Sequence, residues 1–158
     1  MEKEYSFKIL DIKPFIKYLK ENNFILKEET NQIRTLYKRK DNIMLRITIN
    51  EQDNIIKKEF DFKEDKLSNN DYTERKETKS ISYEDDEIIN SIIDIFNYKK
   101  DTELKRKRIV YKKDNIIVEI DSYITPYNDI VFSIEGENIK ELYFDIKKEL
   151  EEYIVKEW

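Results

Sequence analysis

Arginines and carboxylates alternate with apolar residues along residues 106–137 of this chain. Arg106 and Arg108 fall on one face of a predicted strand, and Glu119 and Asp121 fall on the same face of the strand that follows. A strand face of mixed charge is either solvated surface or the lining of a polar cavity. If it lines a cavity, that cavity is expected to hold a charged ligand together with its counter-ions.

Turn residues divide this stretch into three antiparallel strands. Lys113, Asp114 and Asn115 supply the first turn, and Pro126 marks the second because proline cannot donate to a central ladder. The face opposite the charged one is apolar and is expected to pack on helices. It carries Ile109, Tyr111, Val118, Ile120, Phe132 and Ile134.

Composition narrows the chemistry that such a cavity could perform. The 158 residues include no Cys and no His, which excludes disulfides, thiolate nucleophiles and histidine bases. A metal site must therefore consist of carboxylates and water, which suits Mg²⁺, Mn²⁺ or Ca²⁺. The net charge of −5 argues against a nucleic-acid partner.

The same sequence sets expectations for location and size. No apolar run is long enough for a signal peptide or a membrane span, so we expect a cytoplasmic protein without a membrane partner. The length fits a single domain over residues 1–158. The sequence does not decide between a monomer and a homodimer, because no pattern in it reports the oligomeric state.

Hydrophobic periodicity predicts the remaining elements. Asp11 and Pro14 mark the start of a helix that runs to about Asn22, and the acids at 84–86 start a second helix to about Asn97. A polar, aperiodic loop is expected at residues 63–75 and a closing amphipathic helix at 139–158. Strands are expected at residues 2–10, 24–40, 43–49, 55–62 and 77–83.

An internal repeat organises these elements. Residues 37–43 (YKRKDNI) match residues 111–116 (YKKDNI) with one deletion, and the order strand, helix, strand, strand, strand occurs on both sides of the match. The repeat halves are about 1–62 and 76–137. The register relates Gln32 and Arg34 to Arg106 and Arg108, Arg46 and Thr48 to Glu119 and Asp121, and Lys58 to Ser133.

Two such halves predict an α+β fold, an eight-stranded antiparallel β-barrel or tunnel with its helices packed outside. A closed barrel removes sheet edges and encloses the polar faces of its strands. The charged side chains would then line the inside of the tunnel.

Short motifs along most of the chain are familiar. They read EKEYSF at 2–7, LRIT at 45–48, IIKK at 55–58, RKRIVY at 106–111 and SIEGE at 133–137. With Asp121 and Pro126 between the last two, they resemble the CYTH superfamily, also called triphosphate tunnel metalloenzymes. The resemblance is closest to short members similar to class IV adenylyl cyclases.

This resemblance implies a triphosphate bound in the tunnel with Mg²⁺ or Mn²⁺. Lys57 and Lys58 are alternatives, because the motif points to the first and the repeat register to the second. The phosphate-binding candidates are Arg34, Arg46, Lys57 or Lys58, Arg106 and Arg108. The metal candidates are Glu2, Glu4, Asp121 and Glu135, and the catalytic candidates are Lys8, Arg106 and Arg108.

The chain also departs from the motifs of that family. Ser6 stands at the motif lysine, Ser133 at a glutamate and Thr48 at an arginine, while Lys8 is the candidate to replace the missing amine. The family's acidic pair on the fifth strand appears as Ser80 and Ser82, or is displaced to Glu77.

Three functions are therefore compared. The first is an enzyme that hydrolyses or cyclises a nucleoside or inorganic triphosphate with divalent metal. The second is a catalytically impaired relative that binds or senses a phosphorylated ligand. The third is a structural domain whose inward charges pair with one another. Metal-dependent phosphate release distinguishes the first, and ligand binding without turnover distinguishes the second.

Overall fold

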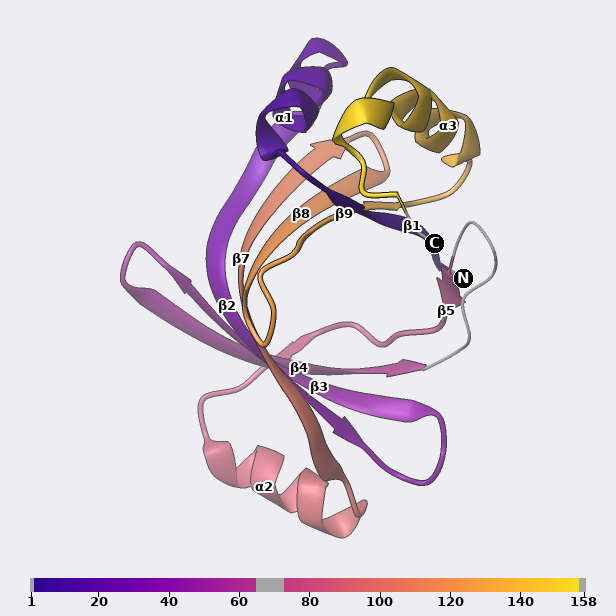
Figure 1. Ribbon diagram of the computed structural model, residues 1–158. Helices are drawn as coiled ribbons and strands as arrows, with labels where there is room; N and C mark the ends of the chain where they lie inside the picture. The colour runs from indigo at the N-terminus through magenta and orange to yellow at the C-terminus, as the bar shows by residue number, and fades with distance from the viewer. Residues whose placement is uncertain (1, 65–72, 157–158) are drawn as a thin grey trace.

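The computed structural model describes residues 2–64 and 73–156 (Figure 1). A single antiparallel sheet curls around a hollow, and its strands lie in the order β5-β1-β9-β8-β7-β2-β3-β4-β6. The strands are β1 (Glu2–Ile9), β2 (Ile25–Lys38), β3 (Ile43–Gln52), β4 (Ile55–Glu64), β5 (Thr73–Arg75), β6 (Ile81–Ser82), β7 (Lys99–Lys113), β8 (Ile116–Thr125) and β9 (Ile130–Glu135). The predicted α+β antiparallel architecture is confirmed.

In the described residues three α-helices lie outside the sheet, and the first two begin directly after a capping aspartate. They are α1 (Ile12–Glu21), α2 (Asp86–Ile95) and α3 (Lys140–Glu149). Asp11 caps α1 by accepting from the Lys13 amide at 3.1 Å, and Asp85 caps α2 by accepting from the Glu87 amide at 2.9 Å. Asn and Asp take the left-handed turn positions, among them Asn23 and Asp114, in a chain with a single glycine.

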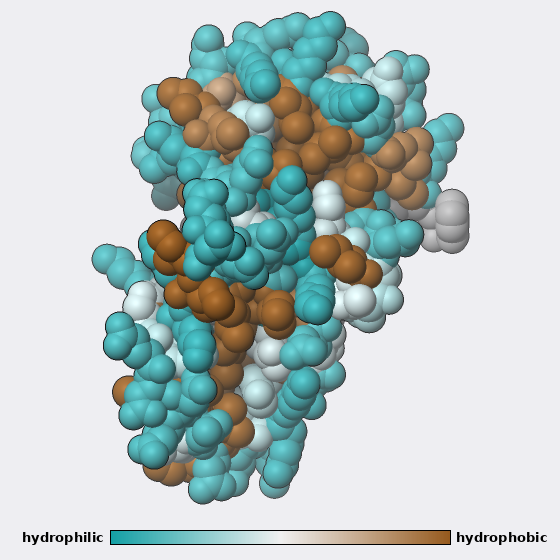
Figure 2. Space-filling view, turned by 90° about the vertical axis from the view of Figure 1, so that its left-hand side faces the viewer, coloured by the Kyte–Doolittle hydropathy of each residue, from teal (hydrophilic) through white to brown (hydrophobic). Residues whose placement is uncertain are grey.

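The apolar faces of the strands build two cores, one under each set of helices. In the larger core, Phe15 of α1 and Ile146 of α3 are fully buried against Phe132 and Ile120 of β9 and β8. The smaller core joins Ile89 of α2 to buried apolar residues of β3 and β4. Burying one such side chain contributes roughly 1.5–3 kcal/mol. On the face shown in Figure 2, hydrophilic side chains surround several exposed apolar patches.

The two ends of the sheet meet through residues 73–82, here called the bridging segment. Its first part, β5, pairs with β1, so that Arg75 lies opposite Glu2. The Lys76 carbonyl then accepts from the Glu64 amide of β4 at 2.8 Å, and β6 pairs with the same strand. Among the described residues no ladder joins β1 directly to β4, so the sheet curls into a tunnel-like wall without closing as a barrel.

Several predicted bounds differ from the structure. The strand expected at 77–83 is reduced to β6, because the preceding residues only bridge to β4. Part of the loop expected at 63–75 is strand β5, and its residues 65–72 lie outside the described part. The closing helix ends at Glu149, a short 3₁₀ turn follows at Glu151–Tyr153, and Ile154 then pairs with Ile9 of β1. No helix in the described ranges is long and apolar enough to cross a membrane.

The internal repeat has a structural counterpart at the centre of the sheet. The strands β2 and β7, each the first strand after a helix, pair antiparallel over almost their whole length. Gln32 lies directly opposite Arg106, the residue that the repeat relates to it. Equivalent residues face one another in this way where a two-fold axis relates two halves. The arginine-bearing strands therefore meet at the middle of the wall.

Candidate functional site

The inward faces of the strands enclose a cavity of about 420 Å³. All central strands contribute to it, because alternate residues of a strand point to the same side. Among the predicted residues, its lining includes Glu4, Arg34, Arg46, Arg106, Arg108, Asp121 and Glu135. The expectation that the charged strand faces line a cavity therefore agrees with the structure.

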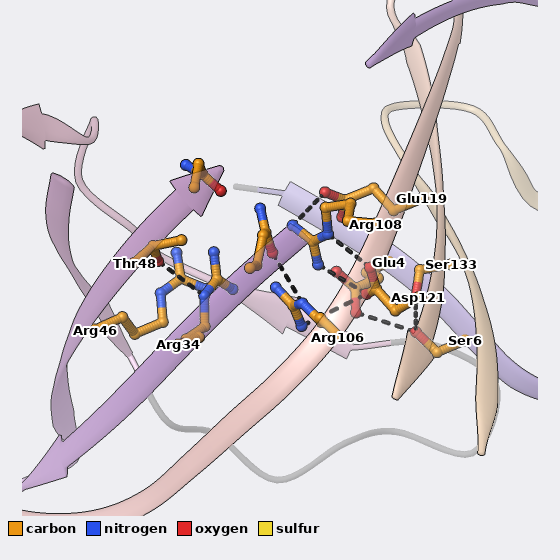
Figure 3. A network of polar contacts seen from close by, with 12 residues as sticks. Glu4, Ser6, Arg34, Arg46, Thr48, Arg106, Arg108, Glu119, Asp121 and Ser133 are labelled. Atoms are coloured by element: carbon orange, nitrogen blue, oxygen red, sulfur yellow. Dashed lines mark hydrogen bonds and ion pairs between the residues drawn. The ribbon is translucent and has the colours of Figure 1, made fainter. Parts of the chain in front are cut away.

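Two of the cavity arginines, Arg108 and Arg46, are paired with carboxylates, and Figure 3 shows the pairs of Arg108. Arg108 binds both carboxylate oxygens of Asp121, at 2.7 and 2.8 Å, and reaches Glu119 at 2.7 Å. Arg46 forms a two-pronged pair with Asp61 and contacts Glu77 at 3.3 Å. Burial lowers the pKa of Arg108, but the charges of Glu119 and Asp121 outweigh it and raise that pKa overall.

The guanidinium of Arg106 has hydrogen-bond partners in the described residues at two of its three nitrogens. Its Nε donates to Gln32 at 2.9 Å, and its Nη1 donates to the Tyr123 hydroxyl at 3.1 Å and lies 3.5 Å from Asp121. Arg106 is 4% exposed, and its Nη2 is buried without any acceptor among the described residues. A buried donor without an acceptor is costly, and a ligand oxygen would satisfy it.

Arg34 is the cavity arginine with no carboxylate partner among the described residues. Its recorded hydrogen bond runs from Nε to the Thr48 hydroxyl at 3.0 Å (Figure 3). Burial lowers the pKa of Arg34 well below its usual range, and the charges of Arg106, Arg108 and Arg46 lower it further. The charge of Asp61 acts in the opposite direction but does not reverse this shift. A buried arginine without a paired carboxylate, beside three other arginines, favours an anion in the cavity.

Carboxylates gather at the other end of the same cavity. Oxygens of Glu4, Glu119 and Glu135, here called the carboxylate cluster, lie within 4.8 Å of one another. Burial raises the pKa of Glu119, but Arg108 and a hydrogen bond with Glu135 outweigh it and lower that pKa to about 2. Glu119 therefore stays ionised at neutral pH, and the cluster has room for a cation.

The two serine departures from the family motifs form one pair. Ser6 of β1 lies directly opposite Ser133 of β9, and their hydroxyls are 3.0 Å apart. Ser6 also donates to Glu4 at 3.1 Å. The resemblance would place a lysine and a glutamate at these positions, and two neutral hydroxyls stand there instead. The local net charge is unchanged by this exchange.

Three predicted lysines lie outside the cavity. Lys8 shares the face of β1 that carries Glu4 and Ser6, but it lies beyond the cavity lining and pairs with Asp129 at 3.2 Å. Lys58 turns outward and contacts Asp86 at 3.3 Å, whereas Lys57 shares the inward face of β4 but lines an adjoining pocket. The motif-based alternative, Lys57, therefore has the better position. Glu2 begins β1, and its side chain lies outside the described residues.

Other lining residues were not singled out from the sequence. Asp61 and Lys63 of β4 are buried in the cavity wall, Lys63 with its amine 3.2 Å from Glu77. Glu119 was placed on the charged face but not among the metal ligands. The alternation of charged residues along β4 was the available signal for Asp61 and Lys63. For Glu119 the missing information was its distance from Glu4, a residue far away in the sequence.

Comparisons with known proteins support the fold. No protein-family profile matches the chain, and no curated protein matches it. A conserved hypothetical protein of Pyrococcus furiosus is similar over 100% of this chain and 97% of its own, with 25% identity and a TM-score of 0.74. HpAC1 from Hippeastrum, a proposed adenylyl cyclase with a dominant triphosphatase activity, matches 96% of this chain and 87% of its own, with 13% identity and a TM-score of 0.70.

The same fold also occurs inside a large assembly. A chain of the Schizosaccharomyces pombe Mediator head module is similar over 98% of this chain and 97% of its own, with 10% identity and a TM-score of 0.61. Identities this low compare folds and not activities. Together with the curled antiparallel sheet and its charged lining, these similarities give the chain a CYTH-like fold.

Proposed function

We propose that this chain is a CYTH family member that binds a nucleoside or inorganic triphosphate in its cavity, together with Mg²⁺ or Mn²⁺. Bound there, the triphosphate is hydrolysed or cyclised by metal-assisted phosphoryl or nucleotidyl transfer. The observation that carries this proposal is Arg34, an uncompensated cation beside three other arginines. A polyphosphate would supply anionic oxygens to Arg34, whose recorded hydrogen bond goes to a hydroxyl and not to a carboxylate.

The carboxylate cluster fits a divalent cation. Opposite oxygens around Mg²⁺ lie about 4.2 Å apart at a ligand distance of ~2.1 Å, and the oxygens of the cluster lie within 4.8 Å of one another. Glu4, Glu119 and Glu135 would hold the ion, and Asp121 remains a fourth candidate although it is paired with Arg108. The ion would supply neutralisation of charge on the phosphate oxygens.

The chain's own residues perform the remaining steps. Arg34 and the free Nη2 of Arg106 bind equatorial phosphate oxygens and hold the phosphate chain in line. Arg108 is bound by Asp121 and Glu119, and these ion pairs fix its position beside the bound anion. Such a site works by positioning and charge neutralisation, so the absence of His and Cys removes nothing that the reaction needs.

The direct test measures release of phosphate and pyrophosphate from tripolyphosphate and ATP with Mn²⁺ or Mg²⁺. Wild type is compared with Arg34→Ala and with Arg39→Ala, whose guanidinium pairs with Asp41 outside the cavity. We expect metal-dependent turnover that Arg34→Ala abolishes and Arg39→Ala retains. Turnover that survives in Arg34→Ala would contradict the proposed site.

A second candidate function is binding without turnover. The neutral pair formed by Ser6 and Ser133 favours it, since a phosphate contact and a metal ligand expected from the family are absent there. Isothermal titration calorimetry distinguishes the two candidates. Tripolyphosphate that binds wild type, yields no product and loses affinity in Arg34→Ala identifies a sensor. Product formation identifies an enzyme.

A further inference from the structure

Helix α2 covers its end of the sheet alone, whereas α1 and α3 lie side by side at the other end (Figure 1). The Tyr18 hydroxyl of α1 donates to Asp145 of α3 at 2.6 Å, so these two helices touch. The smaller core, by contrast, contains residues of no helix other than α2 in the described part of the chain. One flank of α2 therefore lacks the cover that α3 gives to α1.

An apolar stripe runs along α2. Ile88, Ile92 and Ile95 recur at steps of four and three residues, which places them on one line along a helix. Ile88 is 52% exposed and Ile95 is 70% exposed, and neither belongs to the smaller core, whereas Ile92 packs against it. Steps of four and three residues are the spacing of a seam between two paired helices.

Two further exposed side chains widen the stripe. Phe96 ends α2, and Ile81 lies opposite Phe60 in the β4–β6 pair, so that Ile81 shares the outer face of the sheet with this member of the smaller core. Figure 2 shows exposed apolar side chains in the lower part of the molecule, at the level of α2 in Figure 1. Apolar side chains gathered in this way mark an interaction surface. The surface, here called the α2 patch, consists of Ile81, Ile88, Ile92, Ile95 and Phe96.

The charges around α2 differ in sign between its two ends. Four consecutive acids at 84–87 lie at its N-terminal end, and Lys99 and Lys100 follow its C-terminal end. Arg39 adds a positive charge there, since its guanidinium lies 5.8 Å from the centre of the Phe96 ring. Asp94, the acid of the last turn, is turned roughly 100° away from Ile95. Two copies of α2 packed antiparallel would therefore bring the acids of each beside the bases of the other.

We propose that the α2 patch binds the same patch of a second copy of this chain, in a two-fold symmetric homodimer with the two α2 helices antiparallel. A parallel pair would place the acids of both copies side by side, which costs free energy. Because α2 lies on the outer face of the sheet, the contact involves none of the residues that line the cavity. The inference is thus independent of the chemistry proposed for the cavity.

Sedimentation velocity of the full chain over a range of concentrations tests the contact. We expect a dimer for wild type that dissociates in Ile95→Glu, because each contact then takes two carboxylates, one from each copy, into an apolar seam. The dimer affinity should fall by at least roughly a hundredfold. Ile25→Glu is the matched control, since Ile25 is 61% exposed and begins β2 directly after α1, far from α2 (Figure 1).

Charge reversal distinguishes a second copy from any other partner. Glu84→Lys with Glu87→Lys makes both ends of α2 positive, and Lys99→Glu with Lys100→Glu makes both ends negative. Each double variant alone should therefore dimerise more weakly than wild type. An equimolar mixture of the two should form a heterodimer, because opposite charges then meet at both ends of the helix pair. A mixture that stays monomeric would contradict the antiparallel arrangement.

Circular dichroism verifies that each variant is folded, and Ile88→Glu repeats the measurement at the other end of the stripe. Loss of the dimer in both isoleucine variants of α2, with the dimer retained in Ile25→Glu, supports the inference. A wild type that stays monomeric up to roughly 100 μM would overturn it and leave the α2 patch to a different protein. A dimer that persists in both α2 variants, or that is lost equally in Ile25→Glu, would also overturn it.

Discussion

Under the proposed function, Arg34 should be costly to the fold and needed for binding. Its charge lies among three other arginines without a carboxylate partner in the described residues. We expect Arg34→Met to raise the free energy of unfolding by about 1 kcal/mol without ligand, while tripolyphosphate binding is lost. Urea unfolding and calorimetry measure the two effects.

Arg46 provides the matched comparison for Arg34. Arg46→Met removes the partner of Asp61 and Glu77, so we expect it to destabilise the fold by about 3 kcal/mol. If both variants lower stability equally, Arg34 is not the uncompensated cation that its surroundings indicate.

The pH dependence of stability should report Glu119. Its pKa of about 2 in the fold lies below its ordinary value of 4.5, so ionised Glu119 stabilises the fold above pH 4.5. This contribution is lost as the pH falls toward 2. Glu119→Gln has no carboxylate to titrate, so its free energy of unfolding should fall less steeply over this range in urea titrations. An unchanged slope would contradict the ion pair with Arg108.

At the scale of elements, the single glycine marks the end of β9. Gly136 has φ of +147°, and its amide donates to the Lys3 carbonyl of β1 at 3.1 Å. A Cβ there would lie 3.2 Å from the Asn115 carbonyl. We expect Gly136→Ala to lower the free energy of unfolding by roughly 1–3 kcal/mol, measured by urea unfolding. Asn138→Gly, two residues on at φ of +55°, should change it far less.

Hydrophobic periodicity and turn residues predicted most helices and strands. They did not predict which strands pair at the two edges of the sheet. Alternation placed Arg106, Arg108 and Asp121 on an inward face, because a strand with one buried face has a strict period of two. The repeat misplaced Lys58, because a shift of one residue in the alignment moves a side chain to the opposite face. The carboxylate cluster needed distances between β1, β8 and β9, which no local pattern contains.

At the scale of the whole molecule, the central and edge parts of the wall should differ in stability. The β2–β7 ladder is long and lies in the middle of the sheet, whereas the bridging segment makes few hydrogen bonds to β4. We therefore expect the amides of Glu64 and Thr78 to exchange with deuterium much faster than those of Gln32 and Arg106. Hydrogen-exchange mass spectrometry measures this, and equal protection would show a wall that is closed all round.

The curled sheet should therefore be stiff along its central strands and easier to deform at the bridging segment. Widening the cavity would distort the hydrogen bonds between neighbouring strands. At the bridging segment only a few such hydrogen bonds oppose the change. The spacing of Arg34, Arg106 and Arg108 is set by the stiff central strands. If the proposed triphosphates bind here, we expect the bridging segment to move for ligands of different bulk, while the spacing of the three arginines stays the same.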